Sequence, residues 1–196
     1  MANPIDLGTY HIQANPNLYT PQQPNHFEFI ITGIGSLLRA GVSEELATSN
    51  DYIYNAQEVL RLSVNSTSVP HFTMSEIEIS RGNSKVYFPG VPTFSTIPLE
   101  IIDYIGAGSK DAMLAWQRQV YDVTSDRVGS AANCKHNGTL IEYTPNGEMV
   151  RYWDIIGCWP QGFSGDDYNN ENSGKKTLQG TIRYDRAIPH LPDESI

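Results

Sequence analysis

The side chains of this chain that could carry out chemistry are five histidines, two cysteines and several clustered carboxylates. The histidines are scattered along the sequence, at His11, His26, His71, His136 and His190. Only Cys134 and His136 come close together, and their spacing matches no recognised metal-ligand pattern. The sequence also lacks a nucleophile elbow, a phosphate-binding loop and a dinucleotide fingerprint. We therefore predict no catalytic residue, no metal site and no cofactor, and we do not expect an enzyme.

The clustered carboxylates favour the same conclusion. Glu76 and Glu78 would share one face of a strand, as the paired acids of a glycosidase could. Neighbouring glutamates on a wet strand face are far more often simply solvated, so we interpret them as surface residues. The run 166–171 resembles a calcium loop in composition alone, because the ligand spacing of an EF-hand is missing.

Charge and cysteine content narrow the function classes further. The chain has 196 residues, enough for one domain with a substantial core. Its 13 basic and 22 acidic residues give a net charge of −9, which argues against a protein that grips nucleic acid through the phosphates. The two cysteines form no disulfide framework and indicate reduced thiols in a cytoplasm. We find no bilayer-length apolar run and no signal peptide, and therefore expect no membrane association.

Alternating and β-rich runs predict a mostly β domain. The expected strands span residues 27–32, 60–65, 77–80, 85–88, 96–103, 140–143, 149–160 and 177–186. Residues 81–84 and Asn146-Gly147 are typical hairpin turns. Pro98 cannot donate to a strand ladder, so its strand should lie at a sheet edge or begin near that residue. In the last strand Leu178, Ile182 and Tyr184 fall on one face.

A single helix is expected from Ser109 to Tyr121. Ser109 would be its N-cap, and the helical spacing of Met113, Trp116 and Val120 indicates packing against a core. The pattern as a whole predicts an α+β, mostly β domain: a small antiparallel barrel or sandwich of about seven strands with one flanking helix.

The two ends and one internal stretch fall outside this pattern. We expect an extended, proline-rich arm over residues 1–26, a folded domain over 27–186 and a tail over 187–196. The stretch 36–58 is too long for an ordinary connection, and such loops are usually functional.

From Asn25 to Arg186 the order of these elements resembles that of contractile-tailed bacteriophage tail tube proteins. Residues 25–31 look like the first strand of the family, which opens with an Asn-x-Phe element. Residues 76–94 look like its long projecting hairpin. The family's Gly-x-Trp-Pro corner, which precedes a last amphipathic strand, is matched by Gly157, Trp159 and Pro160, and we expect Trp153 to pack in the core beside it.

The resemblance implies a β-barrel that forms hexameric rings, stacked into a hollow tube inside a contractile sheath. It implies a place in the virion tail, assembly in the host cytoplasm and passage of the genome through the lumen. The implied partners are further copies of the chain, the tail sheath, baseplate and tail terminator proteins, and inside the lumen a tape measure protein and double-stranded DNA that must not stick. Type VI secretion and bacteriocin tube proteins share this fold.

The tube hypothesis assigns roles to two sets of residues. Contacts between subunits and stacked rings are expected from the long hairpin and the 36–58 loop, at Glu76, Glu78, Arg81, Lys85, Tyr87, Phe88, Phe94, Leu38 and Arg39. Polar strand faces, lining the lumen or the outer surface, are expected at Arg61, Ser63, Asn65, Thr181, Arg183 and Asp185. An acidic lumen would repel DNA phosphates.

Other functions remain open at this point. Within the tube family, the chain could form a tube-initiating baseplate ring, a bacteriocin tube or a secretion tube. A binding module of another class, such as a carbohydrate-binding sandwich, could use the aromatic residues Tyr52, Tyr54, Trp159 and Phe163.

Overall fold

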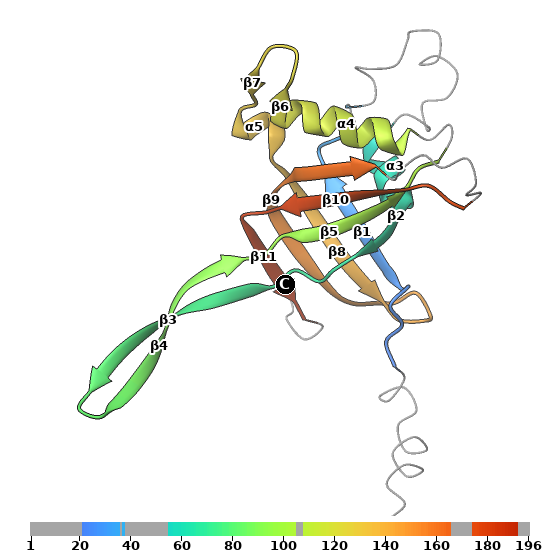
Figure 1. The fold of residues 1–196 in the computed structure, drawn as a ribbon. Helices are drawn as coiled ribbons and strands as arrows, with labels where there is room; N and C mark the ends of the chain where they lie inside the picture. The colour runs from blue at the N-terminus through green and yellow to red at the C-terminus, as the bar shows by residue number, and fades with distance from the viewer. Residues whose placement is uncertain (1–20, 36, 38–54, 105–107, 166–173, 192–196) are drawn as a thin grey trace, which may run out of the picture.

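The computed structural model describes residues 21–35, 37, 55–104, 108–165 and 174–191. Antiparallel strands dominate this part of the chain (Figure 1). The main strands are β1 (Phe27–Thr32), β2 (Val64–Thr67), β5 (Ile97–Ile102), β8 (His136–Tyr143), β9 (Met149–Gly165), β10 (Thr177–Arg183) and β11 (Arg186–His190). They form a seven-stranded sheet in the order β1-β8-β9-β10-β5-β2, with β11 also paired to β9. The predicted fold class, mostly β and antiparallel, is confirmed.

Strand β9 bends this sheet into two halves. Its first part pairs with β8 and β11, and its last part, from Trp159 onward, pairs with β10. The partners change next to Gly157, whose φ of 66° lies in the left-handed region. We call β1, β8, β11 and the first part of β9 the first half-sheet, and the end of β9 with β10, β5 and β2 the second half-sheet.

The core lies between the half-sheets and two helices, α3 (Ala56–Ser63) and α4 (Ser109–Val120). In β1, β5 and β10 buried positions alternate with more exposed ones, as the period of a strand requires. The buried side chains include Phe29, Ile31, Leu140, Ile155, Ile97, Leu99, Ile101, Leu178, Ile182, Val59, Leu60, Met113 and Trp116. In and after β10, Leu178, Ile182 and Tyr184, which the alternation predicted on one face, are all buried.

The predicted helix is confirmed, but the role of Ser109 was wrong. Gly108, in the left-handed conformation, is the N-cap residue of α4. The Ser109 hydroxyl instead donates to the Ile102 carbonyl at 3.0 Å and accepts from the Tyr104 N–H at 3.3 Å. It therefore ties the start of the helix to the end of β5.

The strand predicted over 60–65 was wrong. Residues 56–63 form α3, which Asn55 caps by accepting the Gln57 N–H at 3.1 Å, and β2 begins only at Val64. Burial follows helical spacing, with Val59, Leu60 and Ser63 inside. Leu62, which an alternating strand would bury with Leu60, is 75% exposed. A short run can fit both periods, and here packing against β1 and α4 selects the helix.

Strand β5 is not at an edge, because it lies between β10 and β2. Pro98 is its second residue, and the pairing with β2 begins after it, at Leu99. Pro98 has no N–H to donate, and it lies just before the residues that pair with β2. The second of the two predicted arrangements, a strand that begins near Pro98, is therefore the one observed.

Several element boundaries also differ from the prediction. Residues 89–94, which lay outside the expected strands, belong to a strand, and β9 continues past the expected corner to Gly165. The stretch 122–138 lay outside the expected strands and helix. It holds most of a small hairpin, β6 (Tyr121–Asp122) and β7 (Arg127–Val128), the helix α5 (Ala131–Cys134) and the start of β8. Strand β11 extends the sheet beyond Arg186, where we expected a tail.

Some predictions fall outside the described residues. These include most of the N-terminal arm, most of the 36–58 stretch with Leu38 and Arg39, and the run 166–171. Over the ranges that are described, no helix combines the length and apolarity that crossing a bilayer would require.

Candidate assembly surface

A two-stranded hairpin projects from the body of the molecule (Figure 1). It consists of β3 (Phe72–Arg81) and β4 (Ser84–Phe94), which pair only with each other. All of β3 is exposed, and so is most of β4. Gly82 supplies the positive φ at its tip, and the Ser84 hydroxyl closes the turn onto the Arg81 carbonyl.

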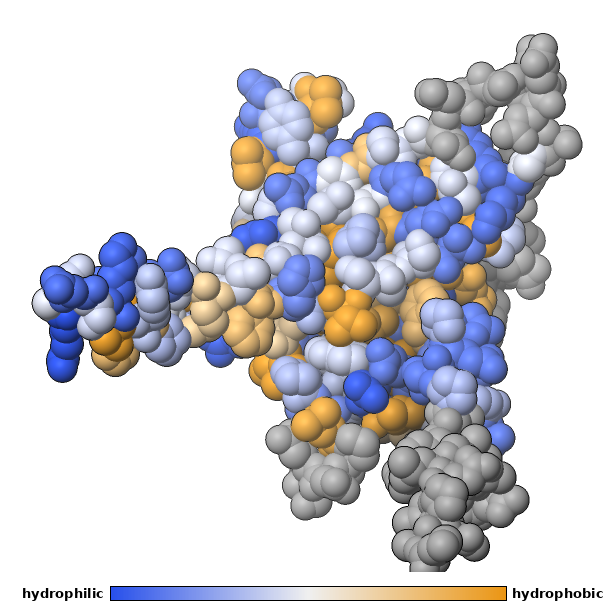
Figure 2. All heavy atoms as spheres, turned by 60° about the horizontal axis from the view of Figure 1, so that its bottom comes forward, coloured by the Kyte–Doolittle hydropathy of each residue, from blue (hydrophilic) through white to orange (hydrophobic). Residues whose placement is uncertain are grey.

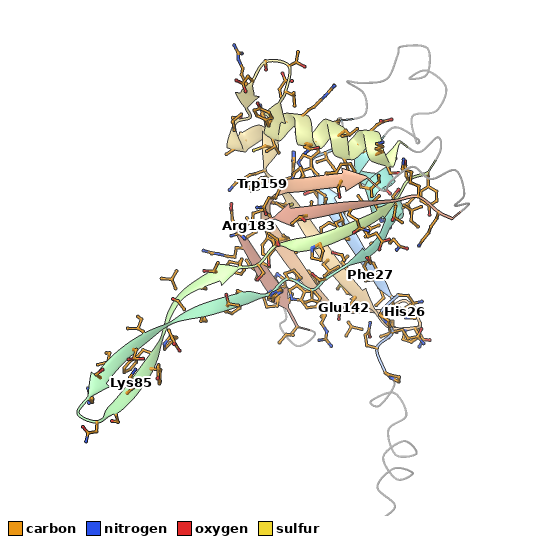
Figure 3. All side chains as sticks on the ribbon, viewed as in Figure 1. His26, Phe27, Lys85, Glu142, Trp159 and Arg183 are labelled. Carbon is orange, nitrogen blue, oxygen red and sulfur yellow. The ribbon has the colours of Figure 1, made fainter. Side chains whose placement is uncertain are left out.

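The two faces of this hairpin differ in chemistry. The pairs Ile77–Phe88 and Ile79–Val86 share one face, and these four side chains are 38–52% exposed. We call them the apolar hairpin face. The opposite face carries Glu76, Glu78, Ser80, Lys85 and Tyr87, with the Lys85 ammonium 2.8 Å from the Glu78 carboxylate. Figure 2 shows hydrophobic side chains along one side and at the base of the hairpin, and Figure 3 places Lys85 near its hydrophilic tip.

Aromatic contacts fix the hairpin to the body. The Phe72 and Phe94 rings lie 5.6 Å apart, and Phe94 packs edge-on against Tyr184 at 5.8 Å. The Tyr184 hydroxyl donates to the His71 carbonyl at 3.1 Å. Because Tyr184 is buried, this chain of contacts links the base of the hairpin to the core.

A β-bulge lies midway along the hairpin, where Ser75 faces two residues of β4. The Ser75 hydroxyl accepts the Val91 N–H at 2.9 Å. A side chain at Gly90 would clash with Ser75, so the close approach of the strands requires glycine there. The outer half of the hairpin is therefore held at a set orientation, and its apolar face has no cover among the described residues.

The expected polar strand face is only partly assembled. Thr181 and Arg183 lie on β10, and Asn65 on β2 accepts from the Lys175 ammonium at 3.0 Å. Arg61 and Ser63 lie on α3 instead, and the Ser63 hydroxyl is buried against the Val59 carbonyl. Asp185 follows β10, and both of its carboxylate oxygens accept from the Lys135 ammonium at 2.7 Å.

The four residues expected at the corner lie along β9. Trp153 packs partly buried against the core, and Pro160 is buried opposite Ile182. Trp159 lies opposite Arg183 (Figure 3). A Cβ on Gly157 would lie 2.4 Å from Asp185 Oδ2, so glycine is required by space as well as by φ.

Burial also sets the chemistry of the adjacent thiol. Cys158 is fully buried, and its S–H donates to the His136 carbonyl at 3.0 Å. This burial raises its pKa to about 12, so it is a neutral structural thiol. Cys134 is half-buried and also free.

An ionic network beside β1 could not be predicted from the sequence. Glu28 accepts from Arg61 and from the Tyr143 hydroxyl, and Arg61 also reaches Glu58 at 3.1 Å. Burial alone would raise the pKa of Glu28, but the hydrogen bonds from Tyr143 and Arg61 outweigh it and lower that pKa. Three segments far apart in sequence meet here, and no local spacing shows that.

Three other kinds of site were considered from the residue types: a metal site, a pair of glycosidase acids and an aromatic binding platform. Across the described ranges, no three His, Cys, Asp or Glu side chains are grouped so as to hold a metal ion. Glu76 and Glu78 lie on the exposed hairpin rather than in the body. Trp159 pairs with Arg183, whereas Phe163 pairs with Gly180 and packs against the core, so these two do not form one aromatic platform.

Comparison with known proteins places the fold. No protein-family model matches the sequence. A curated tail tube protein of Serratia phage KSP90 is 26% identical over 97 residues, which are 49% of this chain and 55% of that protein. The match thus spans about half the length of the relative.

Solved structures match over almost the whole chain. A chain of the PVC sheath–tube complex, from an extracellular contractile injection system, has a TM-score of 0.62 at 15% identity and covers 91% of this chain and 97% of its own. The anti-feeding prophage cap that terminates a tube has a TM-score of 0.61 at 16% identity over 88% of this chain and 92% of its own. This chain has the tail-tube fold. The resemblance to tail tube proteins that the sequence indicated is confirmed.

Proposed function

We propose that this protein is a structural subunit of the inner tube of a contractile phage tail. Hexameric rings of it stack into a conduit for genome delivery. The observation that carries the proposal is the apolar hairpin face, which a rigid base holds away from its own domain. The tail-tube fold and the phage relative supply the context.

Self-association gives the apolar hairpin face a partner. Burying the exposed part of each of its four side chains would contribute about 1 kcal/mol. Head-to-tail contacts between identical subunits close into rings or continue as filaments, and a projecting element that reaches the next copy suits both. The apolar hairpin face, together with Tyr87 and the Glu78–Lys85 pair behind it, would meet neighbouring subunits within or between rings.

The proposed partners follow from the same assembly. The structural neighbours come from a sheath–tube complex, a tube-terminating cap and a baseplate, so sheath, terminator and baseplate proteins are proposed to contact the tube. A tape measure protein and then double-stranded DNA would occupy the lumen. The tube would work in the virion tail after assembly in the host cytoplasm, and it would act by structure rather than catalysis.

A matched pair of substitutions tests the role of the hairpin. Phe88→Glu places a charge on the apolar hairpin face, and Val128→Glu places the same charge on an exposed apolar side chain of β7, outside the hairpin. Because both side chains are exposed in the isolated chain, at 48% and 81%, both variants should fold with unchanged thermal unfolding. We expect Phe88→Glu to abolish sedimentable polymers in ultracentrifugation, and Val128→Glu to retain them. Equal polymerisation of the two variants would contradict the proposal.

A second candidate function is a tube-initiating ring at the baseplate. It is supported by a similar chain in the anti-feeding prophage baseplate, with a TM-score of 0.58 at 10% identity. Such a ring would close but would not grow on itself. Isolated rings without stacks at high protein concentration would favour this alternative over the main tube.

A further inference from the structure

Two Asn-Gly sequences of this chain lie in opposite surroundings. Asn146-Gly147 belongs to the exposed turn between β8 and β9, at an end of the first half-sheet (Figure 1). Asn137-Gly138 lies inside β8, which pairs with β1 on one side and with β9 on the other. In an Asn-Gly sequence the side-chain amide is open to attack by the next backbone nitrogen, because glycine has no Cβ to hinder the approach. The fold therefore decides which of the two sequences can react.

The turn at Asn146 leaves both reacting groups accessible. Asn146 and Gly147 are exposed, and no hydrogen bond from the described residues holds the Asn146 side chain. Gly147 has a φ of 84°, and apart from its chain neighbours no atom lies within 4 Å of the position that a Cβ would take. The Gly147 N–H donates to the Thr144 carbonyl at 2.9 Å, and this bond has to open before the nitrogen can attack. Because it closes only a short exposed turn, its opening costs little free energy.

The fold holds the other Asn-Gly sequence in place. The Asn137 side-chain oxygen accepts the Gly157 N–H at 3.2 Å, and the Asn137 carbonyl accepts the Thr32 hydroxyl at 3.0 Å. Gly138 is buried and is paired with both neighbouring strands. Attack by the Gly138 nitrogen therefore requires β8 to separate from its neighbours, which is an opening of the sheet rather than of a turn.

We propose that Asn146 is a deamidation site, at which the folded chain modifies itself in water. The Gly147 nitrogen loses its proton to the solvent and forms a bond to Asn146 Cγ, and the side-chain amide group leaves as ammonia. Water then opens either C–N bond of the resulting succinimide ring, which gives aspartate or isoaspartate. The net reaction converts one amide and one water into one carboxylic acid and one ammonia, and it needs no oxidant or reductant. The inference does not depend on the proposed tube function.

The modification changes charge and backbone at this end of the sheet. Either product adds a carboxylate next to Glu148, and isoaspartate also adds a methylene group to the main chain of the turn. The Thr144 N–H donates to the Glu148 carbonyl at 2.7 Å, and the Glu148 N–H donates to the Thr144 hydroxyl at 3.1 Å. These bonds lie outside the core, so we expect the modified chain to keep its fold and to differ in the turn and in charge.

Peptide mapping by mass spectrometry tests the assignment on the full-length protein, kept folded in mildly alkaline buffer. Two other asparagines of the same chain are internal controls. Asn137 precedes a glycine but lies in the sheet, whereas Asn83, at the tip of the projecting hairpin, is exposed but precedes Ser84, whose Cβ hinders the attack. In the folded chain Asn146 should convert at least about tenfold faster than Asn137, and also faster than Asn83. In guanidinium chloride Asn137 should reach the rate of Asn146.

The controls separate the possible results. Equal conversion of Asn146 and Asn137 in the folded chain would show that the fold does not select the site, and conversion of Asn146 in denaturant alone would show that the turn protects it. Either result overturns the proposal. A Gly147→Ala variant tests the role of the glycine and should lose most of the conversion at Asn146, while slow conversion of Asn137 in the same sample confirms that the variant is folded. Unchanged conversion at Asn146 in this variant would also overturn the proposal.

Discussion

At the scale of single residues, Gly157 decides the course of the sheet. It has a φ of 66° at the point where β9 changes partners. A Cβ there would lie 2.4 Å from Asp185 Oδ2 and 3.0 Å from Asp185 Cγ. Asp185 cannot withdraw without losing its contacts with the Lys135 ammonium. Backbone conformation and space therefore both select glycine.

We expect Gly157→Ala to lower the free energy of unfolding by about 2–3 kcal/mol. Gly147→Ala is the matched control, because Gly147 also has a positive φ, of 84°, but nothing lies within 4 Å of its Cβ position. The control should cost only the conformational part, about 1 kcal/mol. Urea denaturation of both variants measures the difference, and equal losses would refute the argument from space.

The network around Glu28 predicts a dependence on pH. Its lowered pKa means that the ionised carboxylate is favoured by folding, so its contribution is present above the ordinary pKa of 4.5 and is lost as the pH falls through the lower folded-state value. Arg61 is more than a third exposed, so we expect Glu28→Gln to cost about 1 kcal/mol or less at neutral pH.

This cost should disappear in acid, since the wild-type carboxyl is then protonated as well. Urea unfolding of Glu28→Gln and wild type from neutral to acid pH measures the trend. Glu148→Gln, at an exposed turn, should show no such trend. A cost for Glu28→Gln that stays constant with pH would argue that the side chain acts by packing rather than by charge.

At the scale of elements, the sequence predicted correctly the helices and strands whose hydrophobic residues follow a single period. The hairpin turn at Gly82, the alternation of β10 and the helical spacing of Met113 and Trp116 all matched the structure. Residues 60–65 fit two periods, and the choice depended on β1 and α4, which lie far away in sequence. The central position of β5 likewise depends on two partners from distant segments. Local patterns could not decide either point.

The candidate assembly surface could be predicted only in part from the sequence. The hairpin could be placed from sequence, and so could several of its residues. Its apolar face could not be defined, because that needs the register that pairs Ile77 with Phe88. The bulge at Ser75 shifts this register by one residue of β4, and sequence alternation gives no sign of it.

Helix α4 contributes a large buried side chain, Trp116, to the core. The Trp116 ring is fully buried, and its N–H donates to the Cys134 carbonyl at 3.1 Å. We expect Trp116→Ala to lower the free energy of unfolding by about 3–5 kcal/mol through the cavity and the lost hydrogen bond. Leu114→Ala, at a 39% exposed position of the same helix, should cost less than about 1 kcal/mol. Similar losses in urea unfolding would contradict the core position of Trp116.

At the scale of the whole molecule, the acidic surplus is unevenly distributed. Twelve of the 13 basic residues but only 13 of the 22 acidic residues lie in the described ranges, which therefore carry a net charge of −1, against −9 for the full chain. The remaining −8 belongs to the other segments. The acidic lumen stays a prediction, and it would depend on where the segments that carry the acidic surplus lie in an assembled tube.

The central claim is that this chain assembles into a hollow tube. Negative-stain electron microscopy of the purified full-length protein over a range of concentrations tests it most directly, with Phe88→Glu on a parallel grid. We predict end-on views of hollow, sixfold rings and side views of stacked rings for the unsubstituted chain, and single subunits for Phe88→Glu. Single subunits for both proteins at every concentration, also after addition of isolated phage baseplates as nuclei, would contradict the claim.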